Sequence, residues 1–393
     1  MSKLEELIQQ YCPDGVEYKK LGEITTILRG KRLTKSQLSD DKPYAVYHGG
    51  LDPLGYYESA NRTANTTMII NVGASAGTVG YSKEDFWSSD GCYCIEHSES
   101  FDDRYIYYVL QTQEQQLKSK VRVAGIPTLD RPVVEDLKIP VPPLPVQEEI
   151  VRILDNFAEL QAELQAELQK RLQQYNYYRD NLLSFDGRTD VEWKKLGDVA
   201  TVTKLAGFEF SEYMRYSETG SIIALRGLNV KNGTLDLSDV KYIDNSNFSK
   251  LSRSKLYIND MLYTYVGTVG QVALVGENDK YYLAPNVALI RLSDSNILPK
   301  FLTYFFLTGG FKRTQLDILA AASSMKNITM EKIRLFRVPF IPISEQQKIV
   351  DILDRFHALT TDITAGLPAE IEARRKQYEY YRDQLLTFKQ KAS

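Results

Sequence analysis

The stretch Pro145–Phe185 constrains the fold most, because it contains no glycine and no proline after its first residue. Inside it the tetrapeptide Ala-Glu-Leu-Gln occupies residues 158–161 and recurs at 162–165 and 166–169. Apolar residues follow one another at steps of three and four, which is the period of an α-helix. A helix of about forty residues is far longer than the average of about eleven, and it would extend roughly 60 Å. We expect a rigid spacer that pairs with another long helix.

A second copy of this helix is found near the C-terminus. PLPVQEEIVRILDNF at 143–157 is answered by IPISEQQKIVDILDRF at 341–356, and YNYYRDNLLSF at 175–185 is answered by YEYYRDQLLTF at 378–388. Between these anchors the second copy is four residues longer, and the extra residues lie near Gly366–Pro368. Glycine and proline predict a kink or a short break at this point, which a coiled coil registers as a stutter.

A third repeat divides the chain into domains. VEYKKLGEI at 16–24 matches VEWKKLGDV at 191–199, and each copy precedes a long region whose short apolar runs are typical of β-strands. The predicted fold class is α+β, with two β-rich α/β domains separated by two long antiparallel coiled-coil helices. The first residues should pack beside the end of the C-terminal helix and close a pseudo-twofold circular arrangement. The expected boundaries are an N-terminal segment at 1–20, a first domain at 21–143, a central helix at 144–190, a second domain at 191–342 and a C-terminal helix at 343–393.

Composition and missing motifs argue against an enzyme. The 393 residues carry a formal charge of −3, three cysteines and three histidines. No apolar run approaches the ~18 residues needed to cross a bilayer, and the N-terminus lacks the apolar core of a signal peptide, so we expect a cytoplasmic protein. The chain has no P-loop, no Asn-Pro-Pro-Tyr-like tetrapeptide and no glycine-rich fingerprint for S-adenosylmethionine. Any catalysis should therefore belong to partner proteins.

One cluster resembles a metal site. Cys92, Cys94 and His97 have the residue types of a zinc corner, but a fourth ligand at suitable spacing is missing. The alternative is a strand that carries two cysteines on one buried face. We favour the strand and expect no metal.

The repeats together resemble one known family. The tandem variable domains, the two helix starts that share I-V-x-I-L-D-x-F and the two endings Y-x-Y-Y-R-D-x-L-L are similar to the specificity (S) subunit of type I restriction–modification enzymes. The resemblance covers essentially the whole chain. It implies a non-catalytic subunit of a type I restriction endonuclease and adenine-N6 DNA methyltransferase complex, in which each variable region is a target-recognition domain for one half of a split double-stranded DNA site.

The resemblance also implies partners and cofactors. The helix pair would set the spacer between the half-sites and dock two methyltransferase subunits, with restriction/translocase subunits joining the complex. S-adenosylmethionine, ATP and Mg²⁺ are expected on those partner subunits and none in this chain. Two alternatives remain: a coiled-coil adaptor that binds no DNA, and the recognition half of a fused restriction–methyltransferase system.

Candidate DNA contacts are basic or amide side chains in loops. Arg29–Lys35 places four positive charges around a glycine, which suits phosphate contact, although a solvated loop would look the same. Two further loops follow apolar runs and are as compatible with simple turns as with base contact. The Gly-Thr-Val-Gly strings at 77–80 and 267–270 predict a shared turn, and residues 125–128 and 323–327 should occupy equivalent positions. The candidate contacts are Arg29, Lys31, Arg32, Lys35, His48, Arg226, Asn229 and Lys326.

The long helices supply two further sets of candidate residues. Apolar side chains at helical spacing should pack between the helices. Repeated tyrosines suit a half-buried interface, so we assign the second set to partner docking. The packing set is Leu160, Leu164, Leu168, Leu172, Leu359, Ile363 and Ile371, and the docking set is Tyr177, Tyr178, Arg179, Tyr380, Tyr381 and Arg382.

Overall fold

The computed structural model describes residues 2–97, 99–320, 327–361 and 366–391. It divides into two compact units, one made of residues 1–165 and 370–393 and the other of residues 166–369. Both cuts fall inside long helices, so each unit combines one variable domain with the start of one helix and the end of the other. Among the described residues no helix is long and apolar enough to cross a membrane.

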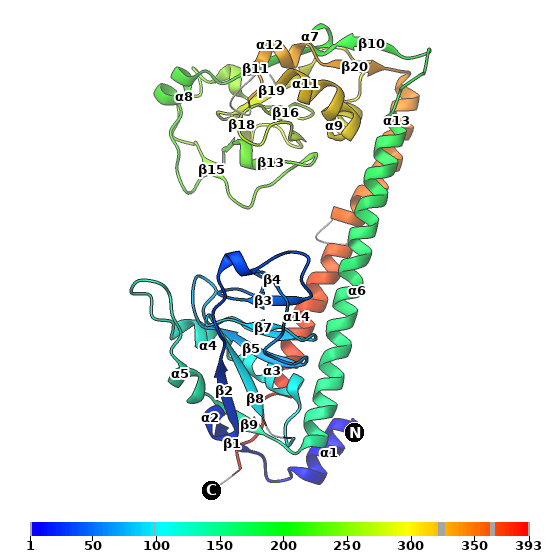
Figure 1. The fold of residues 1–393 in the computed structure, drawn as a ribbon. Coiled ribbons are helices and arrows are strands. Elements are labelled where there is room, and N and C mark those ends of the chain that lie inside the picture. The colour runs from blue at the N-terminus through cyan, green and yellow to red at the C-terminus, as the bar shows by residue number, and fades with distance from the viewer. Residues whose placement is uncertain (1, 98, 321–326, 362–365, 392–393) are drawn as a thin grey trace. The chain divides into compact units, whose positions relative to one another are not determined.

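The first variable domain is built on a four-stranded antiparallel sheet in the order β2-β8-β5-β6 (Figure 1). A three-stranded sheet, β4-β3-β7, lies beside it, and the pair β1-β9 joins the two ends of the domain. The strands are β1 Glu17–Lys20, β2 Thr25–Arg29, β3 Tyr44–Tyr47, β4 Gly55–Tyr57, β5 Thr66–Ile70, β6 Val79–Ser82, β7 Trp87–Ser88, β8 Cys92–His97 and β9 Lys138–Val141. The helices are α1 Lys3–Tyr11, α2 Leu21–Ile24, α3 Asp103–Thr112, α4 Glu114–Ser119 and α5 Arg131–Glu135, with a single turn, η1, at Lys35–Gln37.

The second variable domain repeats this topology. Its sheets are β11-β19-β16-β17 and β15-β12-β18, and β10-β20 replaces β1-β9, while the hairpin β13-β14 is an addition. Its strands are β10 Glu192–Lys195, β11 Ala200–Lys204, β12 Ile223–Leu225, β13 Val230–Lys231, β14 Thr234–Leu235, β15 Lys241–Tyr242, β16 Met261–Thr264, β17 Val272–Leu274, β18 Tyr281–Leu283, β19 Val287–Leu292 and β20 Arg337–Phe340. Its helices are α7 Leu196–Val199, α8 Gly207–Tyr213, α9 Pro299–Leu307, α10 Gly309–Phe311, α11 Asp317–Ala320 and α12 Met330–Arg334, with single turns η2 Gly227–Asn229, η3 Ser252–Ser254 and η4 Lys312–Leu316.

The long helices are α6 Leu144–Leu182, α13 Ile343–Thr361 and α14 Leu367–Leu385. In the first unit Phe157 of α6 stacks on Tyr381 of α14, and in the second unit Tyr178 of α6 stacks on Phe356 of α13, each pair with ring centroids 5.5 Å apart. The start of one helix therefore runs beside the end of the other in each unit, which confirms the antiparallel prediction. The second helix is two elements, and Pro368 lies in the first turn of α14, where proline is tolerated.

Two further predictions about chain ends can be compared with the structure. Val16 forms a parallel bridge with Gln390, and the Tyr18 hydroxyl donates to the Phe388 carbonyl at 3.1 Å, so the N-terminal segment does pack beside the end of the C-terminal helix. The central helix ends at Leu182, before the expected limit of 190, and is followed by a turn that contains Gly187 with φ +78°. A positive φ favours glycine in this turn, which lies five residues beyond the end of the helix.

Each domain is fixed to its long helix by a repeated polar clamp. The Gln147 amide is fully buried, accepts from the Asp102 N–H and donates to the carbonyls of Ser100 and Pro142. Gln346 is equally buried, accepts from the Leu298 N–H and donates to the carbonyls of Asn296 and Ile341.

A second repeated contact lies eight residues further along each helix. Asp155 accepts from the Tyr108 hydroxyl, and Asp354 accepts from the Tyr304 hydroxyl, both at 2.5 Å. These bonds explain why the two helix starts share their polar residues.

The predicted packing set needs correction. Leu160 and Leu359 are 51% and 60% exposed and do not pack, whereas Leu164, Leu168, Leu172 and Ile371 are partly buried and Ile363 lies outside the described residues. For Leu160 the cause is the four-residue repeat, because four residues turn an α-helix by about 400° and each unit therefore advances the leucine by about 40° around the axis. A row of such leucines winds around the helix, and its members cannot all face one partner. Leu359 does not belong to this repeat.

Candidate nucleic-acid interface

The strand registers show which loops of the two domains correspond. Val46 of β3 pairs with Trp87 in parallel, and Ile223 of β12 pairs with Tyr281 in parallel. After these strands the Ser89 N–H donates to the Tyr47 carbonyl, and the Ala284 N–H donates to the Leu225 carbonyl. His48 and Arg226 are therefore the first residues after equivalent strands. Both belong to a group of loops that we call the loop cluster, comprising residues 48–50, 71–77, 89–91 and 128 in the first domain and 226–229, 264–270, 284–286 and 327 in the second.

The predicted shared turn is present in both loop clusters, but the two Gly-Thr-Val-Gly strings occupy different positions in it. The Gly77 N–H donates to the carbonyl of Ile70, and the Gly270 N–H donates to that of Thr264, in equivalent positions between two paired strands. Gly73 and Gly267, with φ +89° and +79°, begin the turn in each domain. The identical Gly-Thr-Val-Gly strings are thus displaced by three residues. Positive φ favours glycine at both ends of the turn, and the strings match only by coincidence.

The predicted equivalence of residues 125–128 and 323–327 is confirmed where it can be examined. Thr128 forms a bridge with Val72, and Asn327 forms the same bridge with Val266. Residue Lys326 lies outside the described residues, so its predicted contact with DNA stays a prediction.

In the first domain two of the predicted residues meet at one acidic residue. Arg29 Nε donates to the Asp90 carbonyl at 3.0 Å, and His48 Nδ1 lies 3.3 Å from the Asp90 carboxylate. The His48 and Asp90 side chains are close enough for an ion pair, but the geometry is not that of a hydrogen bond. Arg29 itself is exposed at the end of β2. Arg29 and His48 therefore both approach Asp90 of the loop cluster, one at its carbonyl and the other at its carboxylate.

The remaining basic residues form a separate exposed segment. Lys31, Arg32 and Lys35 are all exposed, and among the described residues none of them makes an ion pair. The segment is held by its backbone, since the Lys31 N–H donates to the Ser88 carbonyl and Trp87 Nε1 donates to the Lys31 carbonyl. Three unpaired cations on a fixed backbone suit phosphate groups, which need charge rather than a specific fork of donors.

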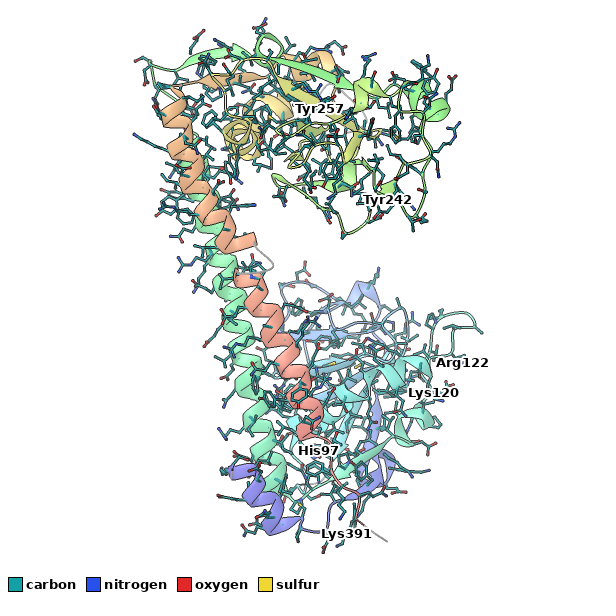
Figure 2. The ribbon with its side chains drawn as sticks, turned by 180° about the vertical axis from the view of Figure 1, so that it is seen from behind. His97, Lys120, Arg122, Tyr242, Tyr257 and Lys391 are labelled. Atoms are coloured by element: carbon teal, nitrogen blue, oxygen red, sulfur yellow. The ribbon has the colours of Figure 1, made fainter. Side chains whose placement is uncertain are left out.

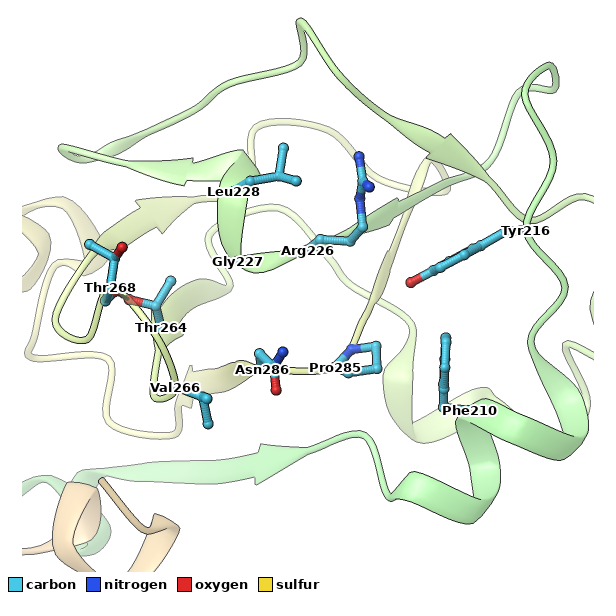
Figure 3. Close-up of a pocket in the computed structure, with 10 residues that line it drawn as sticks. All are labelled: Phe210, Tyr216, Arg226, Gly227, Leu228, Thr264, Val266, Thr268, Pro285 and Asn286. Carbon is cyan, nitrogen blue, oxygen red and sulfur yellow. Dashed lines mark hydrogen bonds between the residues drawn. The ribbon is translucent and has the colours of Figure 1, made fainter. Parts of the chain in front are cut away.

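In the second domain Arg226 lines a cavity of 460 Å³ (Figure 3). Its Nη2 donates to the carbonyl and to the carboxylate of Asp239, at 2.9 and 2.7 Å. The other lining residues come from α8, from the segment that follows it and from the loop cluster. They are Phe210, Tyr216, Gly227, Leu228, Thr264, Val266, Thr268, Pro285 and Asn286.

Asn229 was predicted to contact DNA, but in the structure it supports its own loop. Its side chain is fully buried, its Oδ1 accepts from the Arg226 N–H, and its Nδ2 donates to the carbonyls of Asp236 and Asp239. Every hydrogen-bonding group of the amide is used within the loop, so it has no free donor for a base edge. We therefore assign Asn229 to the support of Arg226 and remove it from the candidate interface.

Cys92 and Cys94 lie on one buried face of β8, packed with Met68, Ile70 and Phe86. His97 lies at the end of the same strand, where its Nε2 is 2.7 Å from an Asp103 carboxylate oxygen (Figure 2). The hydrogen bond between the two thiols raises the pKa of Cys92 and lowers the pKa of Cys94. Among the described residues no group of three or more histidine, cysteine or carboxylate side chains is arranged to hold a metal ion.

The predicted docking residues form two matching surfaces on the long helices. Tyr177 and Tyr380 are 64% and 62% exposed, and each lies edge-on to its neighbour, Tyr178 or Tyr381. The arginines are placed differently from the tyrosines. Arg179 and Arg382 are 12% and 18% exposed, and each binds the aspartate that follows it in the chain. They lie over Tyr175 and Tyr378, so they are mainly internal supports. The tyrosines are the parts that a partner can reach.

Comparisons with known proteins define the class of this fold. The family of type I restriction modification DNA specificity domains matches residues 13–174 and 189–373. A putative type I restriction enzyme specificity subunit of Haemophilus influenzae is 30% identical over 404 residues, which cover 98% of this chain and 98% of that protein. The EcoR124I/EcoR124II specificity subunit of Escherichia coli is 38% identical over 263 residues, covering 64% of this chain and 63% of that protein.

Solved structures agree on the fold. The type I restriction–modification S subunit of M. genitalium superposes with a TM-score of 0.55 at 14% identity, covering 94% of this chain and 95% of that one. A chain from a study of assembly and conformational transition in the type I R-M system gives 0.58 at 14% identity, covering 95% and 98%. The chain therefore belongs to the type I restriction–modification DNA specificity family. It is a specificity subunit, and the resemblance and the fold class predicted from the sequence are confirmed.

The sequence did not indicate the cavity. Phe210 and Tyr216 lie in a part of the second domain whose sequence is not repeated in the first, and Pro285–Asn286 matches no known motif. Asn286 has φ +70°, a conformation that asparagine tolerates better than most residues. An asparagine after a proline, directly before a buried strand, was the one available signal for a tight turn there.

Proposed function

We propose that the two variable domains read the two halves of a bipartite double-stranded DNA site through the loop cluster. The observation that carries this proposal is the same loop cluster at the same place in two equal folds, with different side chains in each. The first domain offers Arg29 and His48 around Asp90, and the second offers Arg226 above a cavity. Two readers with different chemistry fit a site whose halves differ in sequence.

Within this proposal the basic residues divide by task. Lys31, Arg32 and Lys35 hold phosphates and fix the register of the first domain on the duplex. His48 and Arg226 belong to the loop cluster and Arg29 reaches it through the Asp90 carbonyl, so we assign these three residues to contacts with bases. Lys326 remains a further candidate in the second domain.

The helix pair sets the distance between the half-sites and docks two methyltransferase subunits. The support is the pair of matching aromatic surfaces, one on α6 and one on α14, since two equal surfaces suit two copies of one partner. Exposed tyrosines are common anchors at protein interfaces. Restriction/translocase subunits complete the assembly, with S-adenosylmethionine, ATP and Mg²⁺ on the partner subunits, in the cytoplasm.

The test is single-molecule mapping of N6-methyladenine in a host that expresses this chain with its methyltransferase. We expect a bipartite motif with a fixed gap. A continuous motif, or none, would refute the proposal. The adaptor alternative is separated by a gel-shift titration of the reconstituted complex, because a DNA-binding complex must lose affinity steeply with added salt whereas an adaptor shows no shift at any salt concentration.

A further inference from the structure

The two loop clusters differ at one equivalent position. In the first domain a Cβ added to Gly91 would lie 2.7 Å from both His48 Nδ1 and Val72 Cγ1, so these side chains close the space beside Gly91. In the second domain the equivalent residues, Asn286, Arg226 and Val266, border the 460 Å³ cavity. This volume lies within the range of about 300–1,000 Å³ that is usual for sites of small organic molecules.

The cavity has the walls of a site for a planar, aromatic group. Phe210 and Tyr216 form one side, with ring centroids 5.5 Å apart and an interplanar angle of 59°. Leu228 and Val266 are 43% and 39% exposed and form apolar surfaces that the domain itself leaves uncovered. Figure 3 shows the Arg226 guanidinium on one side of the hollow, with Pro285 and Asn286 opposite. Aromatic and apolar walls with few polar groups favour stacking of a flat ligand.

Arg226 supplies the polar complement. Its Nη2 is fully engaged by Asp239, which fixes the direction of the guanidinium. Its Nε is buried without a hydrogen-bond partner, and Nη1 makes no hydrogen bond among the described residues. Because Nε is enclosed by the protein and Nη2 is occupied, Nη1 is the donor left for a ligand with an acceptor edge. Because Nη2 is occupied, the fork of two parallel donors is not available and recognition rests on single hydrogen bonds.

We propose that this cavity receives one nucleobase of the second half-site, after that base has left the helical stack. The inference rests on the proposed function and names the group that the second domain holds. A base combines a flat face, which stacks on Tyr216 and Phe210, with acceptor atoms for Arg226. An aromatic side chain of a protein partner has the flat face but few or no acceptors, so it fits the cavity less well. A base still in the duplex presents only its edge and would leave the hollow empty.

The first test fills the cavity. Gly227 lines it, its φ is not positive, and a Cβ there meets only Thr264 Cγ2 at 4.0 Å, so Gly227→Leu places a side chain in the hollow without a backbone clash. The matched control is Gly276→Leu, where a Cβ meets nothing within 4 Å and φ is also not positive. With the full chain in complex with its methyltransferase, we expect Gly227→Leu to weaken binding to the methylated motif roughly tenfold to a hundredfold and the control to bind like the wild type. Unchanged affinity of Gly227→Leu would overturn the proposal.

The second test locates the base. 2-Aminopurine is placed at each position of the second half-site in turn, and its fluorescence is expected to rise on binding at one position besides the methylated adenine. That rise should vanish with Gly227→Leu, whereas the rise at the methylated adenine persists. Absence of any second position overturns the proposal even if the bipartite motif is found, and absence of the motif refutes the proposed function instead. If Gly227→Leu impairs assembly with the methyltransferase in native mass spectrometry, a protein side chain occupies the cavity and the proposal is likewise overturned.

Discussion

Gln147 is a single residue on which the joint between the first domain and α6 depends. It is fully buried, and its amide makes three hydrogen bonds to backbone groups. In Gln147→Leu these backbone groups lose their partners, and we expect the free energy of unfolding to fall by roughly 2–4 kcal/mol. Urea unfolding followed by circular dichroism measures the change. Gln165→Leu, at an exposed position of the same helix, is the control and should stay within about 0.5 kcal/mol of the wild type.

Glu149 should make the stability of the first unit depend on pH. The hydrogen bond from Arg152 is the largest effect on the pKa of this carboxyl and lowers it. Burial raises the pKa, and the hydrogen bond from Lys3 lowers it, so that the pKa falls from its usual 4.5 to about 2. Because the pKa is lowered in the folded state, the stabilisation is present above pH 4.5 and is lost as the pH falls from there toward 2.

The corresponding variant is Glu149→Gln. It should be less stable than the wild type at pH 7, and the difference between the two should shrink as the pH approaches 2. Thermal unfolding across this range measures it, with Glu148→Gln as the exposed neighbour for comparison. A difference that stays constant with pH would show that the charge of Glu149 is not responsible.

At the scale of elements, the aromatic surfaces of α6 and α14 can be separated from each other. Tyr177→Ala removes the exposed ring of one surface and Tyr380→Ala that of the other. We expect each single variant to bind one methyltransferase subunit at concentrations where the wild type binds two, and the double variant to bind none. Native mass spectrometry counts the subunits. Tyr257→Ala, which removes a 42% exposed tyrosine of the second domain, is the control (Figure 2). Two bound subunits in both single variants would contradict the assignment.

The elements also show what the sequence could predict. The long helices, their antiparallel pairing and the closing contact of the N-terminal segment follow from repeats of strongly periodic residues such as Ile150 and Ile349. The common topology of the two variable domains does not follow from the sequence, because their strands are short and share almost no sequence. Backbone pairing keeps the topology while the side chains change, so Tyr47 and Leu225 occupy one position without resembling each other.

The candidate site was only partly predictable for a related reason. His48 and Arg226 were found because each follows an apolar run, which marks the end of a strand. Whether the space beside such a residue is filled depends on contacts far apart in the sequence, such as those of His48 with Asp90 and of Arg226 with Asp239. Local patterns carry no information about these contacts. The buried role of Asn229 escaped prediction in the same way.

At the scale of the whole molecule, the repeated tetrapeptide connects the length of the chain to the gap in its target. Deleting Ala166–Gln169 removes four residues from the middle of α6, shortens the helix by roughly 6 Å and turns its end by about 40°. Duplex DNA rises about 3.4 Å per base pair, so we expect the gap to shorten by one or two base pairs while both half-sites keep their sequence.

The matched control for this deletion is an insertion of one more Ala-Glu-Leu-Gln unit after residue 169, which should lengthen the gap by the same amount. Both variants keep the helical pattern of α6, because one whole unit of the repeat is removed or added. Methylation mapping of the three chains side by side measures gap and half-sites together. Because the loop clusters lie within the domains and are untouched, changed half-sites with an unchanged gap would mean that α6 does not set the spacing.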